Sequence, residues 1–142
     1  MNKKKRDVTT KSIDKLLRFL PIFEQECYEF SKWHFPEPSE DGTNYFPHGD
    51  YSEKVSEFEK ALYEEGFIIS FDWAKWQNEA EKYCLEPKRL KTADLTTLQK
   101  LLTTHIRKER FCEGHLGAML KAGHITDILR RLKEIRKEMI KK

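Results

Sequence analysis

The chain has 142 residues, a length that usually forms a single domain, and 17 of its residues are aromatic. Charged residues make up 36% of the sequence, apolar residues 38%, and the mean hydropathy is −0.78. The aromatic content argues against a disordered chain, and the total of 11 glycines and prolines excludes collagen-like and low-complexity sequences. We therefore expect a polar, folded, single-domain protein.

The net charge of +3 conceals an uneven distribution of charge along the chain. Residues 1–6 carry four basic side chains, residues 7–87 carry 8 basic and 18 acidic ones, and residues 88–142 carry 15 basic and 6 acidic ones. Sixteen of the 17 aromatic residues precede residue 84. This pattern predicts a boundary between an aromatic, acidic half and a basic half, and a pocket there would be the place to look for function.

The sequence favours a cytoplasmic protein with reduced thiols. No apolar run approaches the roughly 18 residues that cross a bilayer. Asp7 and Asp14 follow the basic start, where a signal peptide would have an apolar core. The three cysteines, Cys27, Cys84 and Cys112, are too widely spaced to indicate a disulfide framework or a redox pair.

The N-terminal third predicts a disordered basic arm at residues 1–8, followed by one domain at residues 9–142. Apolar residues recur at helical spacing from about Lys11, so we expect a helix there that Pro21 kinks or restarts and that continues through Phe30. Residues 34–50 contain three prolines and no helical period, which predicts one long Pro-rich loop.

The middle of the chain predicts two further helices. Asp50 and Glu53 have the spacing of a capping box, and Gly66 is typical of a residue that ends a helix. Residues 67–71 are apolar but have no partner strand, so a buried extended connector is expected. Asp72 then begins the next helix.

The C-terminal third predicts three helices. The first begins at Thr92 or Asp94, the second ends at Gly123, and the last runs close to the C-terminus. The apolar residues of all three follow the helical period. The sequence as a whole therefore predicts an all-α fold, a single compact domain of about six helices.

Two blocks of the sequence resemble a known family. Residues 66–76 read GFIISFDWAKW, and residues 103–132 read TTHIRKERFCEGHLGAMLKAGHITDILRRL. With these blocks the chain resembles the DUF6508 family of small bacterial and archaeal proteins of unknown function, over about residues 11–135. The matching positions are Phe71-Asp72-Trp73, Trp76, Thr104-His105, Arg107, Arg110-Phe111, Gly114, Leu116, Gly123, Ile125, Ile128-Leu129 and Arg131-Leu132. The resemblance implies a shared fold and a shared site, but no reaction.

The strongest candidate site is a group of charged and histidine side chains in the second block. Its members are His105, Arg107, Arg110, Glu113 and His115. Arg107 and Arg110 are three residues apart on a predicted helix, and paired guanidinium groups bind phosphate or carboxylate bidentately. The alternative is that these arginines pair with the acidic half, around Asp72 or Glu79, as structural ion pairs. His105 shares a helix face with apolar residues and is expected to point inward.

Trp73 and Trp76 form a second candidate site, again three residues apart on a predicted helix. Their rings could line a pocket on which a base or another ring stacks. The alternative, which the helical spacing favours, is that they belong to the core.

Metal binding is the third candidate. His105, Cys112, His115 and His124 include one Cys-x-x-His step, and zinc accepts such ligands. Structural zinc sites usually have two closely spaced ligand pairs, and only one is present here. The sequence therefore predicts no metal and no cofactor.

Together these features predict a binding module for an anionic, phosphate-bearing ligand, such as a nucleotide, a nucleic-acid end or a phosphorylated partner. The Arg/His group would bind the anion and Trp73 or Trp76 would stack on the ligand. Two alternatives remain open. One is a small hydrolase with His105 or His115 as general base. The other is a structural protein whose acidic and basic faces join copies into a homo-oligomer.

Overall fold

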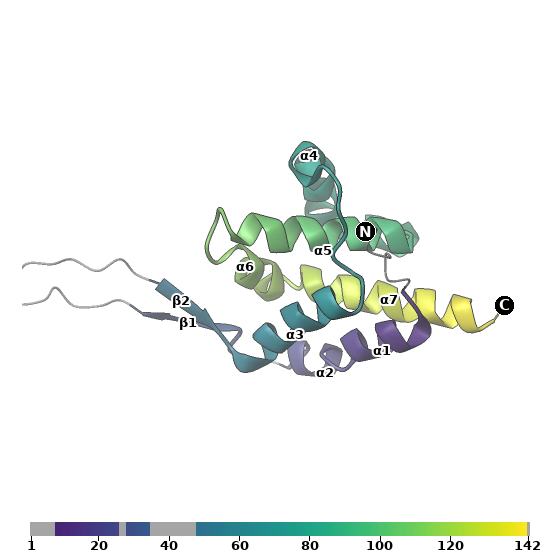
Figure 1. The fold of residues 1–142 in the computed structure, drawn as a ribbon, viewed down its shortest axis with the longest axis horizontal. Coiled ribbons are helices and arrows are strands. Elements are labelled where there is room, and N and C mark those ends of the chain that lie inside the picture. The colour runs from purple at the N-terminus through teal and green to yellow at the C-terminus, as the bar shows by residue number, and fades with distance from the viewer. Residues whose placement is uncertain (1–7, 26–27, 35–47, 142) are drawn as a thin grey trace, which may run out of the picture.

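Helices form most of the chain, and one small antiparallel sheet lies beside them (Figure 1). The computed structural model describes residues 8–25, 28–34 and 48–141. In chain order its elements are α1 (Thr10–Leu17), α2 (Leu20–Phe23), β1 (Ser31–His34), β2 (His48–Tyr51), α3 (Glu53–Glu64), α4 (Trp73–Leu85), the 3-10 helix η1 (Pro87–Thr92), α5 (Leu95–Glu109), α6 (His115–Lys121) and α7 (His124–Ile140). The expected all-α, single-domain fold is confirmed, with seven α-helices in the described residues.

The N-terminal region departs from the predicted long helix. Pro21 does restart the helix, since it lies in the first turn of α2, but α2 ends at Phe23. The prediction that the helix continues through Phe30 is wrong, because the chain instead enters β1, where Ser31 pairs with Tyr51 of β2. That pairing joins residues far apart in sequence, which a local periodicity does not reveal. Residues 1–7 of the predicted arm and residues 35–47 of the predicted loop lie outside the described residues.

Polar caps fix where the other helices begin. Ser52 caps α3 by accepting a hydrogen bond from the backbone of Val55. The predicted cap at Asp50 is wrong, because Asp50 belongs to β2, where it pairs with Lys32. Asp72 and Asp94 cap α4 and α5 as predicted. Gly66, with φ of 80°, follows α3 at its C-terminal end. Residues 67–71 form a connector without helix or strand, as expected, but only Phe67 of these residues is fully buried.

Helix α7 is the centre of the core. It contacts α1, α2, α5, α6 and η1, and it runs between α5 and the α1–α3 layer (Figure 1). Its inward side chains, at helical spacing, are at most 7% exposed; they are Ile125, Ile128, Leu129, Leu132 and Ile135. Helix α4 lies on the outer side of α5, and its only fully buried residue is Ala80. Many buried side chains therefore anchor α7 in the core, whereas few buried side chains anchor α4.

Ion pairs connect the acidic and basic parts of the chain. Asp14 of α1 pairs with Arg136 of α7, and Arg130 Nε lies 3.7 Å from Glu24 Oε1. A third pair lies within the acidic half, where Lys15 Nζ is 3.1 Å from Glu65 Oε1. The two oppositely charged regions of the sequence thus meet within one chain.

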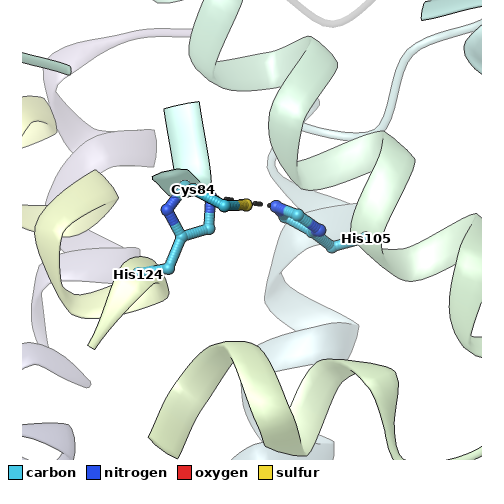
Figure 2. A group of neighbouring side chains, drawn as sticks. All are labelled: Cys84, His105 and His124. Carbon is cyan, nitrogen blue, oxygen red and sulfur yellow. Dashed lines mark hydrogen bonds between the residues drawn. The ribbon is translucent and has the colours of Figure 1, made fainter. Parts of the chain in front are cut away.

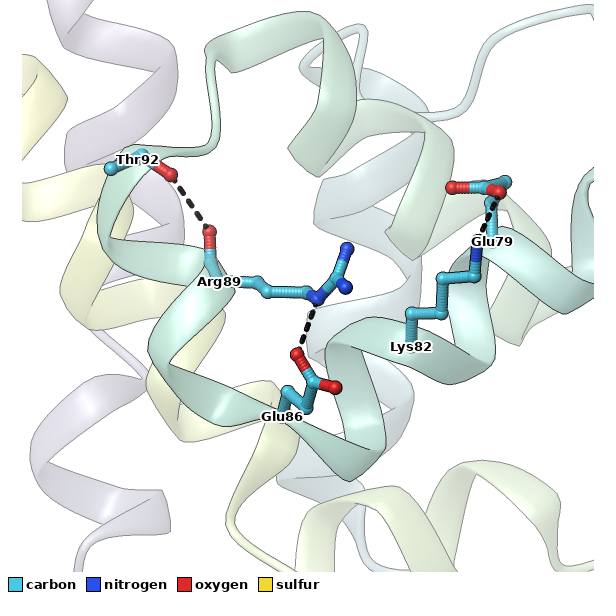
Figure 3. Close-up of polar contacts among 5 residues, drawn as sticks. All are labelled: Glu79, Lys82, Glu86, Arg89 and Thr92. Carbon is cyan, nitrogen blue, oxygen red and sulfur yellow. Dashed lines mark hydrogen bonds and ion pairs between the residues drawn. The ribbon is translucent and has the colours of Figure 1, made fainter.

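Other ion pairs lie within single elements at the surface. In Figure 3, Lys82 Nζ lies 2.8 Å from Glu79 Oε1 in α4, and Arg89 Nε lies 2.7 Å from Glu86 Oε2. All four side chains are about half exposed, so solvent screens both pairs and each contributes little to stability. No helix in the described part of the chain is both long and apolar enough to cross a membrane.

Gly123, between α6 and α7, gives a testable prediction for the fold. It has a left-handed backbone with φ of 81°, and an added Cβ would meet nothing within 4 Å. Gly123→Ala should therefore lower the free energy of unfolding by about 1–2 kcal/mol through backbone strain alone. Gly123→Asn should lower it less, because asparagine tolerates this conformation better. Urea denaturation measures both; equal losses would show that steric contact, not backbone strain, sets the cost.

Candidate functional site

Three histidines from three helices form a hydrogen-bonded row in the interior. His105 of α5 lies in the middle: its Nδ1 is 3.0 Å from His115 Nε2, and its Nε2 is 3.0 Å from His124 Nε2. His105 is 3% exposed and His124 is 5% exposed, whereas His115 is half-buried. The sequence predicted that His105 points inward and grouped it with His115. His124, which completes the row, was grouped with these two histidines only as a possible metal ligand, together with Cys112.

Burial keeps the row uncharged at neutral pH. It is the main cause that lowers the pKa of His105 far below its ordinary value and the pKa of His124 to about 4. Burial also lowers the pKa of His115, where the nearby Lys108 acts in the same direction. A neutral imidazole has one donor and one acceptor. His105 therefore donates a hydrogen bond to one neighbour and accepts one from the other.

The carboxylate of Glu109 holds the turn that brings His115 to His105. Helix α6 begins after Gly114, which has no side chain to cap it. Glu109 supplies the missing acceptor, because its Oε2 accepts from Gly114 N at 2.9 Å and its Oε1 accepts from Leu116 N at 2.8 Å. The chain therefore folds back directly after α5, and His115, the first residue of α6, faces His105.

The hydroxyl of Tyr51 extends this network to the sheet. It donates a short hydrogen bond to Glu109 and accepts one from Gly117 N at 3.0 Å. Burial and the bond to Glu109 raise the pKa of Tyr51, so the phenol remains a donor. Burial and the nearby charge of Glu109 also raise the pKa of Glu59. At Gly117 an added Cβ would lie 3.2 Å from the Tyr51 ring, so a glycine leaves space for this contact.

Two sulfur atoms lie against the histidine row. The Sγ of Cys84, in the last turn of α4, lies within 4.8 Å of a ring nitrogen of His105 and one of His124 (Figure 2). It is also 3.7 Å from Met119 Sδ. Cys84 is half-buried, and burial raises the pKa of its thiol. The sequence considered Cys112 beside the histidines, but Cys112 is exposed in the turn after α5, and no spacing rule pointed to Cys84.

The predicted arginines and tryptophans do not belong to the histidine row. Trp73 and Trp76 are in α4, and Arg107 is in α5. Arg107 is two residues past His105, and such residues point to different sides of a helix. Lys100 lies on the side of Arg107 by helical spacing, Phe111 lies in the turn just past α5, and both Lys100 and Phe111 contact α4. Lys100 Nζ is 5.8 Å from the centre of the Trp76 ring, and the ring centres of Phe111 and Trp73 are 5.8 Å apart. We call Trp73, Trp76, Lys100, Arg107 and Phe111 the α4–α5 aromatic face.

The predicted acidic partners of the arginines are engaged elsewhere. Asp72 pairs with Lys75 and Glu79 pairs with Lys82, both within α4. Arg107 is partly exposed and Arg110, the first residue past α5, is exposed; neither forms an ion pair with any residue that the structure describes. Glu113 is exposed in the turn between α5 and α6.

The predicted site residues therefore separate into two groups. His105 and His115 belong to the interior row. By contrast, Trp73, Trp76 and Arg107 belong to the α4–α5 aromatic face, and Arg110 follows the last residue of α5. Trp76 also packs against the core, so the core interpretation of the tryptophans holds in part. Phe111, the one aromatic residue of the basic half, contacts the aromatic half here and is 76% exposed.

Two cavities of about 550 and 810 Å³ open elsewhere on the described surface. The smaller lies between α2, the residues before β1 and the turn from α6 to α7. The larger lies between η1 and α7, and both basic and acidic side chains line it. Neither is lined by the histidine row or by the α4–α5 aromatic face. The mixed charge of the larger cavity favours neither an anion nor a cation.

Comparison with known proteins identifies the family. A family model described as "Family of unknown function (DUF6508)" matches residues 8–138, so the chain belongs to this family. The match confirms the resemblance seen in the sequence. No curated protein and no solved structure matches the chain.

Glu109→Gln tests the network that positions His115. A glutamine amide retains only one acceptor oxygen, so at least one of the three donors that now bind Glu109 loses its partner. We expect a loss of about 1–3 kcal/mol in the free energy of unfolding, measured by urea denaturation. The control Glu79→Gln removes an exposed carboxylate and should change it by less than about 0.5 kcal/mol. A similar loss in both variants would contradict the proposed role of Glu109.

The histidine row predicts a loss of stability in acid. Since the pKa of His124 is about 4 in the folded protein and near 6.5 in the unfolded chain, the unfolded chain binds more protons between these values. Lowering the pH from 7 to 5 should therefore remove about 2 kcal/mol of stability through His124 alone. The titratable groups around His124 are His105, His115, Cys84 and Asp127.

Urea denaturation at the two pH values measures this loss. His124→Gln keeps a hydrogen-bonding side chain but does not titrate, so its stability should fall by about 2 kcal/mol less than that of the wild type. An equal fall in both proteins would mean that His124 is not buried as a neutral ring.

Proposed function

We propose that this member of the DUF6508 family is a binding module for a phosphate-bearing ligand, and that the ligand binds at the α4–α5 aromatic face. One observation carries the proposal: Trp73 and Phe111 are in contact, with ring centres 5.8 Å apart, and Phe111, four residues after Arg107 in the chain, is 76% exposed. Arg107 and Arg110 have no described carboxylate partner that would compete for them.

The chemistry of this face suits a ligand with both a ring and a phosphate. Guanidinium groups donate paired hydrogen bonds to phosphate oxygens, and a loss of such bonds costs more than a loss of neutral ones. Exposed tryptophan and phenylalanine rings stack on bases with little sequence preference. Lys100, which lies over the Phe71 and Trp76 rings, adds a further positive charge on this face. Nucleotides and single-stranded nucleic-acid ends combine the two features, and a cytoplasmic location, which is part of the proposal, would supply both.

The alternatives from the sequence remain predictions. For a hydrolase, His105 is poorly placed as a general base because both of its ring nitrogens are engaged, so His115 at the edge of the row is the better candidate. For a homo-oligomer joined by charge, several acidic and basic residues that could meet between copies already pair within the chain. Neither alternative is carried by an observation comparable to the Trp73–Phe111 contact.

The test measures binding of a fluorescent single-stranded RNA, ATP and tripolyphosphate to the wild type and to Arg107→Ala/Arg110→Ala. Two lost guanidinium contacts should weaken binding more than about tenfold. They should also reduce the dependence of log affinity on log salt concentration by about 1–2. Trp73→Ala should weaken binding of RNA and ATP but not of tripolyphosphate, because only the first two have bases to stack.

The matched control is Lys91→Ala/Lys133→Ala. It removes the same charge from exposed positions on η1 and α7, away from the proposed face. We expect the control to bind all three probes nearly as well as the wild type. The proposal fails if no probe binds or raises the melting temperature, or if the control loses as much affinity as the arginine variant.

A further inference from the structure

We propose that Cys84, His105 and His124 bind a soft metal ion with a filled d shell, Zn²⁺ or Cu⁺, where α4, α5 and α7 meet. In the described residues this is the group whose ligand atoms lie close enough to share one ion, all within 4.8 Å of one another (Figure 2). It is independent of the proposed ligand site, which uses other side chains of α4 and α5.

The two histidine nitrogens fit a tetrahedral ion after small movements, and the sulfur of Cys84, within 4.8 Å of them, has to come to about 3.6 Å from each. With metal bonds of about 2.0–2.1 Å to nitrogen and about 2.3 Å to sulfur, two nitrogens of one site lie about 3.3 Å apart and two sulfurs about 3.8 Å apart. His105 Nε2 and His124 Nε2 are now 3.0 Å apart, so each ring has to move by only a few tenths of an ångström. Cys84 Sγ and Met119 Sδ are 3.7 Å apart, so the thioether lies close enough to the Cys84 ligand atom to be tested as a fourth ligand.

The hydrogen bonds of the histidine row also fix the orientation of His105, its central residue. Ligating histidines commonly donate the other ring N–H to an acceptor, which fixes the ring and the tautomer. His105 has this arrangement, since its Nδ1 lies 3.0 Å from His115 Nε2 and its Nε2 faces His124. With the proton on Nδ1, the lone pair of Nε2 points to the proposed site. The group offers nitrogen and sulfur ligand atoms, whereas Mg²⁺ and Ca²⁺ require oxygen ligands.

The proton balance of binding is simple. Both imidazoles are neutral before binding and remain neutral, with His124 carrying its proton on Nδ1. The thiol of Cys84 is protonated before binding and becomes a thiolate, because the thiolate is the form that binds metals. One proton is therefore released to solvent for each ion bound, and no oxidation or reduction takes place.

Such an ion would fasten α4 to the rest of the molecule. Ala80 is the only fully buried residue of α4, whereas His105 and His124 belong to well-buried helices. A bond from Cys84 to the ion would connect the last turn of α4 to α5 and α7 in the way that structural zinc stabilises small domains. Metal binding should therefore raise the melting temperature.

The experiment uses the full chain, freed of metal by a chelator and kept reduced without added thiols. Co²⁺ serves as a spectroscopic probe, and Zn²⁺ and Cu⁺ are titrated against chromophoric chelators, the latter without oxygen. We expect one ion per chain, a thiolate-to-Co²⁺ charge-transfer band, release of one proton and a higher melting temperature. Cys84→Ser should abolish the band, whereas Cys112→Ser, the same change at an exposed cysteine, should retain it.

Two further variants complete the test. His124→Gln, checked by circular dichroism for a native fold, should weaken binding of Zn²⁺ and Cu⁺ at least about tenfold. Met119→Leu identifies the ion: weaker Cu⁺ binding with unchanged Zn²⁺ binding indicates copper, because thioethers prefer Cu⁺. The proposal is overturned if the wild type shows no charge-transfer band and no competition with the chelators, or if Cys84→Ser keeps the band of the wild type.

Discussion

The carboxylate of Glu109 is the constraint on which the arrangement of the C-terminal helices depends. Glu109 is the last residue of α5. Its carboxylate accepts hydrogen bonds from the backbone at the start of α6 and from Tyr51 of β2. Gly114 leaves α6 without a side-chain cap, so an acceptor has to come from elsewhere in the chain. Because Glu109 provides it, α6 packs back along α5 and His115 reaches His105. The sheet is tied to the same point through Tyr51.

Local patterns in the sequence predicted the helices well and the long-range contacts poorly. Asp72 and Asp94 were identified as caps because a cap acts on residues two or three positions away. The sequence predicts a helix through Phe30 and no strand at Ser31–His34, because the partner strand lies beyond the loop and apolar residues such as Phe23 continue a helical period. Phe30 is buried in the structure, and an apolar residue is expected to be buried in a helix as well as in an extended segment. Its apolar character therefore does not distinguish a helix from a strand at this point of the chain.

The candidate site shows the same limit. Helical spacing placed His105 inward and predicted that Arg107 and Arg110 can act together, which required only α5. The contact of Trp73 with Phe111 and the approach of Cys84 to His124 depend on how α4 crosses α5 and where α7 begins. No spacing in the sequence encodes that crossing. A signal was nevertheless present in composition, since Phe111 is the only aromatic residue after residue 84 and lies where the two halves meet.

The proposed metal ligands and the α4–α5 aromatic face share no side chain, but both depend on how α4 packs against α5. Helix α4 carries Trp73 at its start and Cys84 near its end, and α5 carries Arg107 and His105 on different sides. Since α4 buries few groups, its position depends strongly on the contacts of these few side chains. A change at Cys84 that shifts α4 must also shift Trp73 relative to Phe111. The position of α4 is therefore the one feature on which both the contact of Cys84 with the histidines and the contact of Trp73 with Phe111 depend.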